Sequence, residues 1–407
     1  MPRVVFINRF YWPAESATAQ LLTDLAEALA RTGHEVTVLT SAPAMWPQRR
    51  ETRAGVLIHR VSAIRWSRRH IPGRIADFIT FYAGCALTLL SVARRHDMVV
   101  AMTDPPLVGA LAWLIATSRG ARVVQWIQDI YPEVAAGLTG QRWLTILCPL
   151  RDFVWRRSAA CVVPGSDMAR APHGAGVASD RILVSPNWAP AGVAPAEPAV
   201  VADRRRAWDL DGKFVIGYSG NLGRVHDLVP LIELAEGLRD DPAIAFVIVG
   251  EGAQRAALQR LATARKLPVR FLPPQPRHNL SASLGAIDLH LVTLRPEAER
   301  WVFPSKLYGV AAAGRPVLFI GPPEAEIAQL VRQHRLGAAF SREATPDMLR
   351  WIRALRNDPG ELHRMQAAAT QFAAGGFPTA LSTWNDILAR GLAANPRNGY
   401  ATSATSS

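Results

Sequence analysis

Continuous apolar runs alternate along the chain with apolar residues at helical spacing. Residues 4–7 form a continuous apolar run, which is typical of a buried strand. Five apolar side chains then follow at helical spacing: Leu21, Leu22, Leu25, Ala26 and Leu29. Gly33 stands where such a helix would end, and a second apolar segment occupies 34–40. The start of the chain therefore predicts a strand, a helix and a second strand.

The same alternation continues through the first half and begins again in the second. In the first half it predicts further strands at 56–61, 97–102, 121–128, 160–164 and 182–185, with helices at 78–94, 107–118 and 143–157. In the second half it predicts strands at 214–218, 244–249, 269–272, 288–292 and 316–320, with helices at 227–239, 254–265, 279–284, 306–313 and 325–334, and more helices to about 390. Strict alternation of strand and helix indicates an α/β fold with doubly wound parallel sheets.

A segment rich in Pro, Ala and Val separates the two halves and predicts a division into domains. We expect a Rossmann-like domain at 1–190, a linker at 191–212 and a second Rossmann-like domain at 213–365. Helices at 366–392 are expected to cross back to the first domain, and 393–407 to be a disordered tail. Ligands of open α/β sheets bind beyond the carboxyl ends of the strands, so the site is expected in a cleft between the two domains.

Composition narrows the class of protein. The 407 residues carry a net charge of +13, and only three of the 46 cations are lysines. No helix-turn-helix, zinc-ligand or RNA-binding pattern accompanies the charge, so nucleic acid is not an expected partner. The longest apolar stretch, 78–93, is shorter than the ~20 residues of a spanning helix. A cytoplasmic protein, peripheral on the inner face of the plasma membrane, is expected.

Two glycine-rich turns follow strands of the second half. Gly220, Asn221 and Gly223 end one strand, and Gly250 and Gly252 end the next. Glycine lets backbone N–H groups approach phosphate oxygens closely, which predicts contacts to a diphosphate. Tight turns without a ligand are the alternative.

A third segment, Pro304, Ser305 and Lys306, reads as the start of a helix. A cation in the first turn of a helix opposes the helix dipole unless an anion binds there. Lys306 is therefore a candidate phosphate ligand, with a solvated surface lysine as the alternative.

Strand-end loops of the first half carry candidates for acid–base chemistry and sugar binding. Asp129 and Glu133 follow the predicted strand 121–128 and could act as a general base. For Glu133 the alternative is a carboxylate at a helix start. Tyr11, Glu15 and Asp104 lie in two other strand-end loops and are candidates for acceptor binding, although both loops could be rigid turns.

Metal binding is not expected. Asp209 and Asp211 form an Asp-x-Asp pair, but they precede a strand and read as a turn. No other His, Asp or Glu cluster has ligand spacing. The three cysteines, Cys85, Cys148 and Cys161, are scattered in apolar surroundings and predict neither disulfides nor a metal site.

A basic segment at 49–74 precedes the apolar helix predicted at 78–94. Its candidates for contact with an anionic membrane surface are Arg65, Trp66, Arg68, Arg69 and Arg74. The alternative is a core helix with solvated basic flanks.

Several of these motifs together resemble a known family. The segment 25–40, the Asp129-Ile-Tyr-Pro-Glu133 motif, the Pro-Asn-Trp of 186–188, the two glycine turns and Pro304-Ser-Lys-Leu-Tyr308 stand in the order and spacing of family 4 retaining glycosyltransferases of GT-B fold. The resemblance covers residues 4 to about 392. It is greatest to the bacterial branch that builds capsule, colanic-acid and O-antigen polysaccharides.

The resemblance implies a nucleotide diphosphate sugar as donor, bound by the second domain, and no cofactor or metal. It implies that Gly220, Asn221, Gly223 and Arg224 lie by the diphosphate and that Lys306 neutralises it. Glu326 stands where an acidic residue of the donor site often recurs. Asp129 is expected at the acceptor, a polyprenyl-diphosphate-linked glycan, and other enzymes of polysaccharide assembly are implied partners.

The chain also departs from the family pattern. Two glutamates that the family often carries with seven residues between them are replaced by Trp301 and Gly309, although Glu297 and Glu299 lie nearby. Either Arg224 or His226 could serve as the usual basic residue after the first glycine turn. Two alternatives to a transferase therefore remain. One is a catalytically silent subunit that binds nucleotide sugar or membrane, and the other is a GT-B nucleotide-sugar epimerase.

Overall fold

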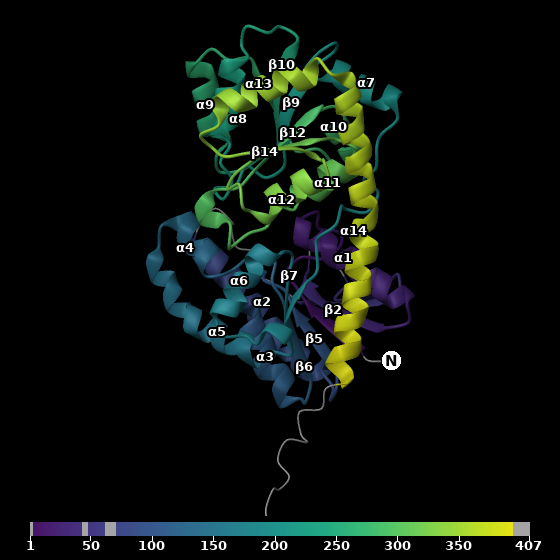
Figure 1. Cartoon of the computed structure of the whole chain (residues 1–407). Coiled ribbons are helices and arrows are strands. Elements are labelled where there is room, and N and C mark those ends of the chain that lie inside the picture. Colours follow the sequence, from purple (N-terminus) through teal and green to yellow (C-terminus); the bar gives the residue numbers. More distant parts are fainter. Residues whose placement is uncertain (1–2, 43–47, 62–70, 394–407) are drawn as a thin grey trace, which may run out of the picture.

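The computed structural model describes the backbone of residues 3–42, 48–61 and 71–393, and the side chains of these residues except 71–75 and 390–393. The described residues form two α/β domains, one above the other in Figure 1, each built on its own twisted sheet. The predicted fold class, α/β with two domains built on doubly wound parallel sheets, is confirmed.

The first sheet has eight strands among the described residues and is parallel except at one edge. Its spatial order is β3 (Arg50–Arg53), β4 (Val56–Val61), β2 (Glu35–Ser41), β1 (Arg3–Ile7), β5 (Met98–Ala101), β6 (Arg122–Trp126), β7 (Ala160–Val163) and β8 (Ile182–Val184). Only β3 runs antiparallel to its neighbour, β4. Successive side chains of β1 alternate between the two faces: Val4 and Phe6 pack on one, Val5 and Ile7 on the other.

Helices cover both faces of this sheet. They are α1 (Ala17–Arg31), α2 (Ile71–Val92), α3 (Val108–Ser118), α4 (Glu133–Thr139), the 3₁₀ segment η1 (Arg142–Leu147), α5 (Cys148–Arg157), α6 (Ser166–Gly174) and the 3₁₀ segment η2 (Ser179–Arg181). Leu22 and Leu25 of α1 pack on the face that carries Phe6. Phe81 of α2 and Ala112 of α3 pack on the opposite face with Val5.

The second sheet is parallel throughout. Its order is β11 (Val269–Leu272), β10 (Ile244–Val249), β9 (Phe214–Ser219), β12 (Leu289–Thr293), β13 (Val317–Ile320) and β14 (Gly337–Phe340). Its helices are α7 (Pro198–Ala207), α8 (Val229–Gly237), α9 (Arg255–Ala264), η3 (Arg277–Asn279), α10 (Leu280–Gly285), η4 (Pro296–Ala298), α11 (Lys306–Ala312), α12 (Glu326–Gln333) and α13 (Thr345–Arg356).

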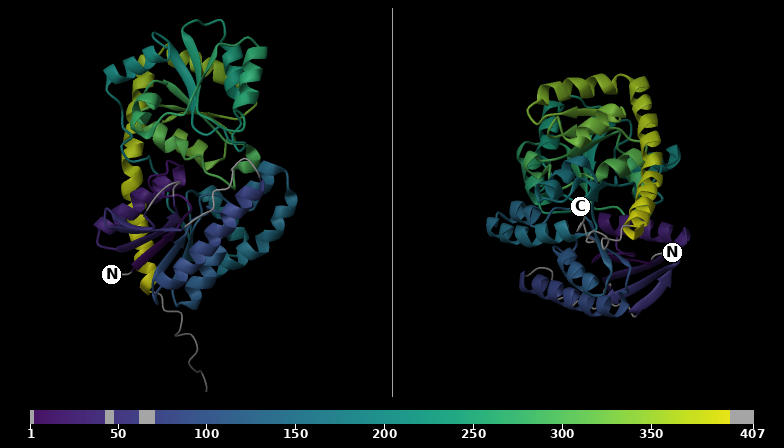
Figure 2. Two further views of the ribbon diagram at one scale, coloured as in Figure 1. Left: turned by 180° about the vertical axis from the view of Figure 1, so that it is seen from behind. Right: turned by 60° about the horizontal axis from the view of Figure 1, so that its bottom comes forward.

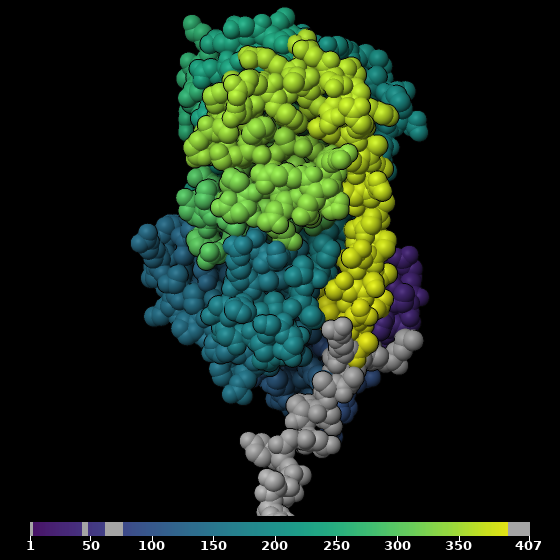
Figure 3. Space-filling view, viewed as in Figure 1, coloured from purple at the N-terminus to yellow at the C-terminus, as the bar shows by residue number. Residues whose placement is uncertain are grey.

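A single long helix, α14 (Pro359–Ala393), runs along both domains and forms the yellow column in Figures 1 and 3. Met365 packs in the core of the second domain, whereas Trp384 packs against Phe6 and Trp126 in the first. Between these ends, Phe377 contacts Trp188 of the connecting segment with ring centroids 5.3 Å apart. The two segments that pass between the domains therefore touch each other.

The elements differ from the predicted ones at short or marginal segments. β3, α4, α6, α7 and β14 were not among the predicted elements, and α2 begins at Ile71 instead of 78. β3 and β14 are four residues each, and the burial of β3 alternates weakly because it is an edge strand. α7 lies within the segment 191–212 that was expected to be a linker.

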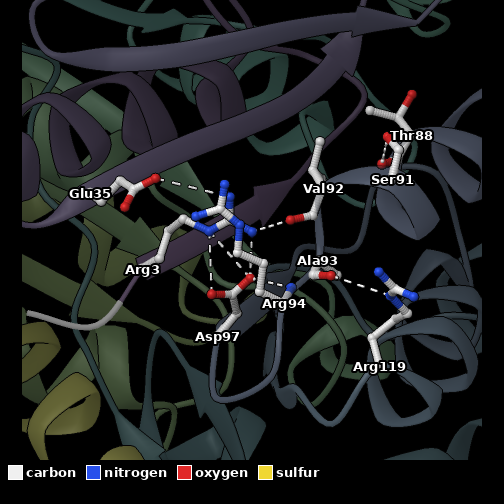
Figure 4. Close-up of polar contacts among 9 residues, drawn as sticks. All are labelled: Arg3, Glu35, Thr88, Ser91, Val92, Ala93, Arg94, Asp97 and Arg119. Atoms are coloured by element: carbon white, nitrogen blue, oxygen red, sulfur yellow. Dashed lines mark hydrogen bonds and ion pairs between the residues drawn. The ribbon is translucent and has the colours of Figure 1, made fainter.

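Polar contacts surround the amino-terminal ends of β1 and β5, two central strands of the first sheet (Figure 4). The buried guanidinium of Arg3 pairs with Asp97 and donates to the carbonyl of Val92. Asp97 also accepts from the N–H of Arg94 at 2.7 Å. These contacts join β1 to the end of α2. The amino-terminal ends of the strands are therefore occupied by structural contacts, and their carboxyl ends are left for ligands.

Candidate functional site

The carboxyl ends of strands from both sheets meet at the boundary between the domains. A cavity of about 210 Å³ there is lined by Glu15 and Ala17 after β1 and by Ser219, Gly220 and Lys306 of the second domain. Asp129 after β6 lines a separate cavity of about 30 Å³ and forms a backbone bridge across the boundary with Val302. The boundary thus gathers the loops in which the sequence predicts donor and acceptor residues.

Lys306 is the first residue of α11 and the central cation of this cavity. Its Nζ lies 2.8 Å from Nε2 of His226 and 5.4 Å from the ring centroid of Tyr218. Among the described residues it has no carboxylate within ion-pair distance. Because the ammonium is removed from water, its pKa is lowered from 10.5 to about 8.

The hydrogen bonds of His226 define its tautomer. Nδ1 lies 3.1 Å from the carbonyl oxygen of Thr293, which can only accept, so Nδ1 carries the proton. Nε2 is then free to accept from the Lys306 ammonium. Burial, followed by the charge of Lys306, lowers the pKa of His226 to about 3, so the ring is neutral. A neutral imidazole orients the ammonium without cancelling its charge.

The two glycine turns pack directly on each other. A Cβ at Gly250 would stand 2.0 Å from the carbonyl oxygen of Gly220, and one at Gly252 would stand 2.7 Å from the backbone of Leu222. A Cβ at Gly220 would stand 2.5 Å from Cε of Lys306. All three glycines have φ between +140° and +151°, where side chains are strained. Their first role is therefore to let the turns and Lys306 approach one another.

The amides of these turns are partly used within the protein. The N–H of Gly220 donates to Val249 at 2.9 Å and that of Leu222 donates to Glu251 at 2.8 Å. Asn221, Gly223 and Gly252 donate no backbone hydrogen bond within the described part of the chain. Of the glycine-turn residues predicted to contact a diphosphate, these three have amides available for it.

Ser305 adjoins the same cavity but does not cap its helix as predicted. Ser305 lines the cavity beside Lys306, whereas Pro304 is buried. The N-cap position is Ser305, but its backbone is helical and its side chain makes no capping bond. The hydroxyl of Ser305 is therefore free to meet a ligand. Gly309, one turn later, also lines the cavity, where a Cβ would meet only Pro190 and Leu284 at 3.8 and 4.0 Å.

On the first domain, Asp129 and Asp104 form an acidic pair at the ends of β6 and β5. Burial, followed by the Asp104 charge, raises the pKa of Asp129 to about 6. Burial also raises the pKa of Asp104 to about 6, with the guanidinium of Arg9 opposing the shift. The N–H of Asp129 donates to Oγ1 of Thr103 at 3.2 Å, which ties the two strand ends together. A carboxylate with a pKa near neutrality suits a general base.

Sequence reasoning missed three residues around this pair. Arg9 donates its N–H to the carbonyl of Asp104 at 2.8 Å and forms an ion pair with the buried Asp77 of α2. Tyr82, also on α2, donates to the carbonyl of Pro106. Arg9 lies two residues after the end of the first strand, which was a usable signal, but the contribution of α2 depends on tertiary packing.

Two first-domain candidates lie in positions that do not support their predicted roles. The Glu133 carboxylate pairs with Arg151 and accepts from Cys148, which matches the alternative of a structural carboxylate at a helix start. Tyr11 is 2% exposed and packs in the core, so its side chain does not reach the cleft. Glu15 is exposed and lines the cavity of Lys306, on the donor side of the boundary.

Two second-domain candidates contact the first domain instead of the Lys306 cavity. Arg224 donates to the carbonyl of Leu138 at 2.9 Å and lines a separate cavity of about 630 Å³ together with Trp301. The carboxylate of Glu326 accepts from Oγ of Ser166 at 3.1 Å. Of the two basic residues offered by the sequence, His226 rather than Arg224 lies at Lys306.

The predicted membrane residues Arg65, Trp66, Arg68 and Arg69 lie outside the described residues, as does the side chain of Arg74. The described part of the same domain exposes other large apolar side chains on adjacent helices. They are Ile79, Leu87 and Leu90 of α2, Leu114 of α3, Trp143 and Ile146 of η1, and Leu150 and Phe153 of α5. We call this set the apolar face; its helices pack side by side and are visible from behind in Figure 2.

Neither a membrane span nor a metal cluster is found within the described residues. No helix there is both long and apolar enough to traverse a bilayer. No group of three or more His, Cys, Asp or Glu side chains there is arranged to hold a metal ion.

Comparison with known proteins agrees with this architecture. Residues 17–188 match the family model of the glycosyl transferase 4-like domain, and residues 202–372 match that of the glycosyl transferases group 1. The Escherichia coli (strain K12) protein WcaI, named for a glycosyl transferase of colanic acid biosynthesis, is 29% identical over 343 residues, which cover 79% of this chain and 83% of WcaI. WbjE of Pseudomonas aeruginosa, named as a glycosyltransferase, is 28% identical over 62% of this chain and 64% of its own.

Solved structures share the fold at low sequence identity. HepE of Anabaena, in complex with UDP-glucose, superposes with a TM-score of 0.70 at 18% identity, covering 96% of this chain and 99% of HepE. WaaG, a glycosyltransferase involved in lipopolysaccharide biosynthesis, superposes with a TM-score of 0.67 at 15% identity, covering 94% and 98% of the two chains. The two family models follow each other on the two domains, and the chain belongs to the family 4 glycosyltransferases of GT-B fold.

Proposed function

We propose that the protein transfers a sugar from a nucleotide diphosphate sugar to a lipid-linked glycan, on a polyprenyl diphosphate carrier, during synthesis of a cell-surface polysaccharide. The names of WcaI and WbjE support a role in glycan assembly, and that of WcaI points to an exopolysaccharide. The complexes of HepE with UDP and UDP-glucose support a nucleotide sugar as donor. Retention of configuration and independence from metal are part of the proposal.

The observation that carries the donor assignment is the environment of Lys306. A partly buried ammonium that is held by a neutral histidine, and that has no carboxylate partner within the described chain, is charged but uncompensated. An anion in the adjoining cavity would supply the missing charge. The free amides of Asn221 and Gly223 and the hydroxyl of Ser305 are suited to phosphate oxygens.

The proposed chemistry uses one group from each domain. The bond between the anomeric carbon and the diphosphate oxygen breaks, and its electron pair stays on the diphosphate, where Lys306 stabilises the charge. The acceptor hydroxyl oxygen forms the new bond on the same face of the sugar, and its proton passes to the carboxylate of Asp129. Asp129 then releases that proton to solvent.

The apolar face supports a membrane-bound acceptor. Leu87 and Ile146 are 71% and 75% exposed, and exposed arginines flank the face at Arg94, Arg119 and Arg157. Apolar side chains bordered by cations are suited to an anionic lipid surface, where the apolar groups enter the interface and the cations meet headgroups. We propose that this face holds the protein on the inner side of the plasma membrane.

The donor assignment is tested by thermal unfolding with UDP, GDP, ADP, CMP and dTDP, using wild type and Lys306→Ala. A ligand at 100 times its Kd should stabilise the fold by about 2.7 kcal/mol. We expect one diphosphate to raise the melting temperature of the wild type and to lose this effect in the variant. No shift with any of them would contradict the proposal. Binding without sugar turnover would instead favour the silent subunit, because Gly309 brings no carboxylate to the cavity.

A further inference from the structure

The amino-terminal ends of α6, in the lower domain of Figure 1, and α12, in the upper domain, are joined by hydrogen bonds across the domain boundary. The N-cap positions of the two helices are Gly165 and Ala325, and neither supplies a side-chain cap. Helix amino termini leave N–H groups that need acceptors. Each helix takes its acceptor from the other domain.

The caps are reciprocal. Oδ2 of Asp167, in the first turn of α6, accepts from the N–H of Glu326 at 2.6 Å. Oε2 of Glu326, the first residue of α12, accepts from Oγ of Ser166 at 3.1 Å and from the N–H of Asp167 at 3.4 Å. Asp167 is 6% exposed, so its carboxylate depends on these partners and on Arg170, 3.3 Å away.

Close approach at this point requires Gly165. A Cβ there would stand 2.3 Å from Oε2 of Glu326 and 2.6 Å from the ring of Phe303. The backbone of Gly165 is extended, with φ −163°, so the glycine serves proximity and not an unusual conformation. Figure 3 shows the surfaces of these two regions in contact.

These contacts adjoin the segment that leads into Lys306. The N–H of Ile130 donates to the carbonyl of Trp301 at 2.9 Å, and Asp129 bridges to Val302. Phe303 follows immediately, three residues before Lys306. Within the described chain, the bridge between Asp129 and Val302 is the one strand-like pairing that joins the Asp129 loop to the Lys306 loop. The contacts between Glu326 and Asp167 lie beside this bridge.

We propose that Ser166, Asp167 and Glu326 form a clasp that holds the two domains closed and thereby positions Lys306 opposite Asp129. Glu326 is in this view a positioning residue and not a ligand of the donor, which revises the role expected from the sequence. The oxygen of Glu326 that makes these contacts already has two donors, and Glu326 does not line the Lys306 cavity. Only the activity measurement in the test of this proposal rests on the proposed transferase function.

The test compares Glu326→Ala, Asp167→Ala, their double variant and the amide variant Glu326→Gln. Hydrogen bonds to charged groups contribute about 1.5–3 kcal/mol, which corresponds to roughly a tenfold to hundredfold change in the ratio of closed to open molecules. We expect each alanine variant to increase the radius of gyration in small-angle X-ray scattering. We expect release of nucleoside diphosphate from the sugar nucleotide to fall with the closed fraction, by at most this factor.

Two further readouts separate a clasp from other roles. Affinity for the nucleoside diphosphate that stabilises the wild type should stay within about twofold, and Glu326→Gln, which keeps an acceptor oxygen, should restore most of the release. The double variant should be no worse than either single variant, because opening either half opens the clasp. A loss of nucleotide affinity without expansion would identify Glu326 as a donor ligand and overturn the proposal.

A wedge variant tests closure without removing a hydrogen-bonding group. Gly165→Ala should expand the molecule as Glu326→Ala does, whereas Gly174→Ala, on the same helix with nothing within 4 Å of the added Cβ, should leave it compact. Unchanged scattering in all the variants would refute the clasp. If the wild type shows no turnover, the transferase proposal fails, while scattering and nucleotide affinity still decide whether the clasp exists.

Discussion

At the residue scale, the buried ammonium of Lys306 lowers the stability of the ligand-free fold at the place where the diphosphate is expected to bind. Lys306 has a pKa of about 8 in the folded chain against 10.5 in the unfolded chain. Below pH 8 it is protonated in both states, so the fold bears the full cost of the buried charge. As the pH rises from 8 to 10.5 the folded chain loses the proton first, and the cost fades.

Lys306→Met should therefore stabilise the ligand-free protein while abolishing nucleotide binding. Each pKa unit corresponds to about 1.4 kcal/mol, so the gain at pH 7 is at most on the order of 3 kcal/mol. Thermal unfolding with and without the preferred nucleoside diphosphate measures both effects. A variant that is less stable than the wild type at pH 7 would show that Lys306 is not uncompensated.

The two titrating groups also predict a bell-shaped dependence of kcat/KM on pH. Activity should fall below pH about 6, where the pair of Asp104 and Asp129 takes up a proton and the base is lost. It should fall again above about 8, where Lys306 loses its charge. Asp129→Asn should greatly reduce activity and leave nucleotide affinity unchanged. A flat profile between pH 5 and 9 would argue against both assignments.

At the element scale, the glycine turns after β9 and β10 act as one unit. Gly250 packs against the carbonyl group of Gly220, and the Lys306 side chain packs against the Cα of Gly220. A change in either turn is therefore expected to move the Lys306 ammonium. Sequence reasoning assigned these glycines to phosphate contact and kept tight turns as the alternative. In the structure the two readings are connected, because the packing of the two turns positions Lys306, the candidate phosphate ligand.

Gly250→Ala should disturb both folding and binding. The positive φ alone costs roughly 1–3 kcal/mol, and overlap with the Gly220 carbonyl adds to it. We expect a lower denaturation midpoint in urea and a loss of nucleotide stabilisation. Gly375→Ala in α14, where nothing lies within 4 Å of the new Cβ, is the matched control and should retain both properties.

At the scale of the whole molecule, α14 links the stability of the two domains. Trp384 is fully buried against Phe6 and Trp126, more than a hundred residues from either in sequence, while Met365 on the same helix packs in the other domain. Cores that share one helix are expected to unfold together.

Trp384→Ala should weaken this link. Removing a buried tryptophan costs about 3–5 kcal/mol, and the cost falls on the first domain. Calorimetry should show one transition for the wild type and two for the variant, with the nucleotide raising only the upper one. Two transitions already present in the wild type would contradict the coupling.

The apolar face gives a second prediction at this scale. A double variant, Leu87→Glu with Ile146→Glu, should lose co-sedimentation with vesicles containing anionic lipid, because buried carboxylates are repelled and costly at such an interface. Val200→Glu, at a half-exposed position of α7 in the other domain, is the control. Equal sedimentation of both variants would place the membrane contact elsewhere, for example in the segment 62–70.

The amino-acid sequence by itself determined the local features of this protein. Continuous apolar runs predicted most of the strands, and the 3.6-residue period predicted most of the helices. Glycines at strand ends marked the turns. All of these signals depend on near neighbours in the sequence. It also supplied Lys306 and Asp129 as candidates. Only the tertiary structure decided which candidates meet: His226 rather than Arg224 beside Lys306, Glu133 paired with Arg151, and Glu326 joined to Asp167. The packing of helices and domains brings these residues together. The residues next to a side chain in the sequence do not determine which partner it meets across a domain boundary.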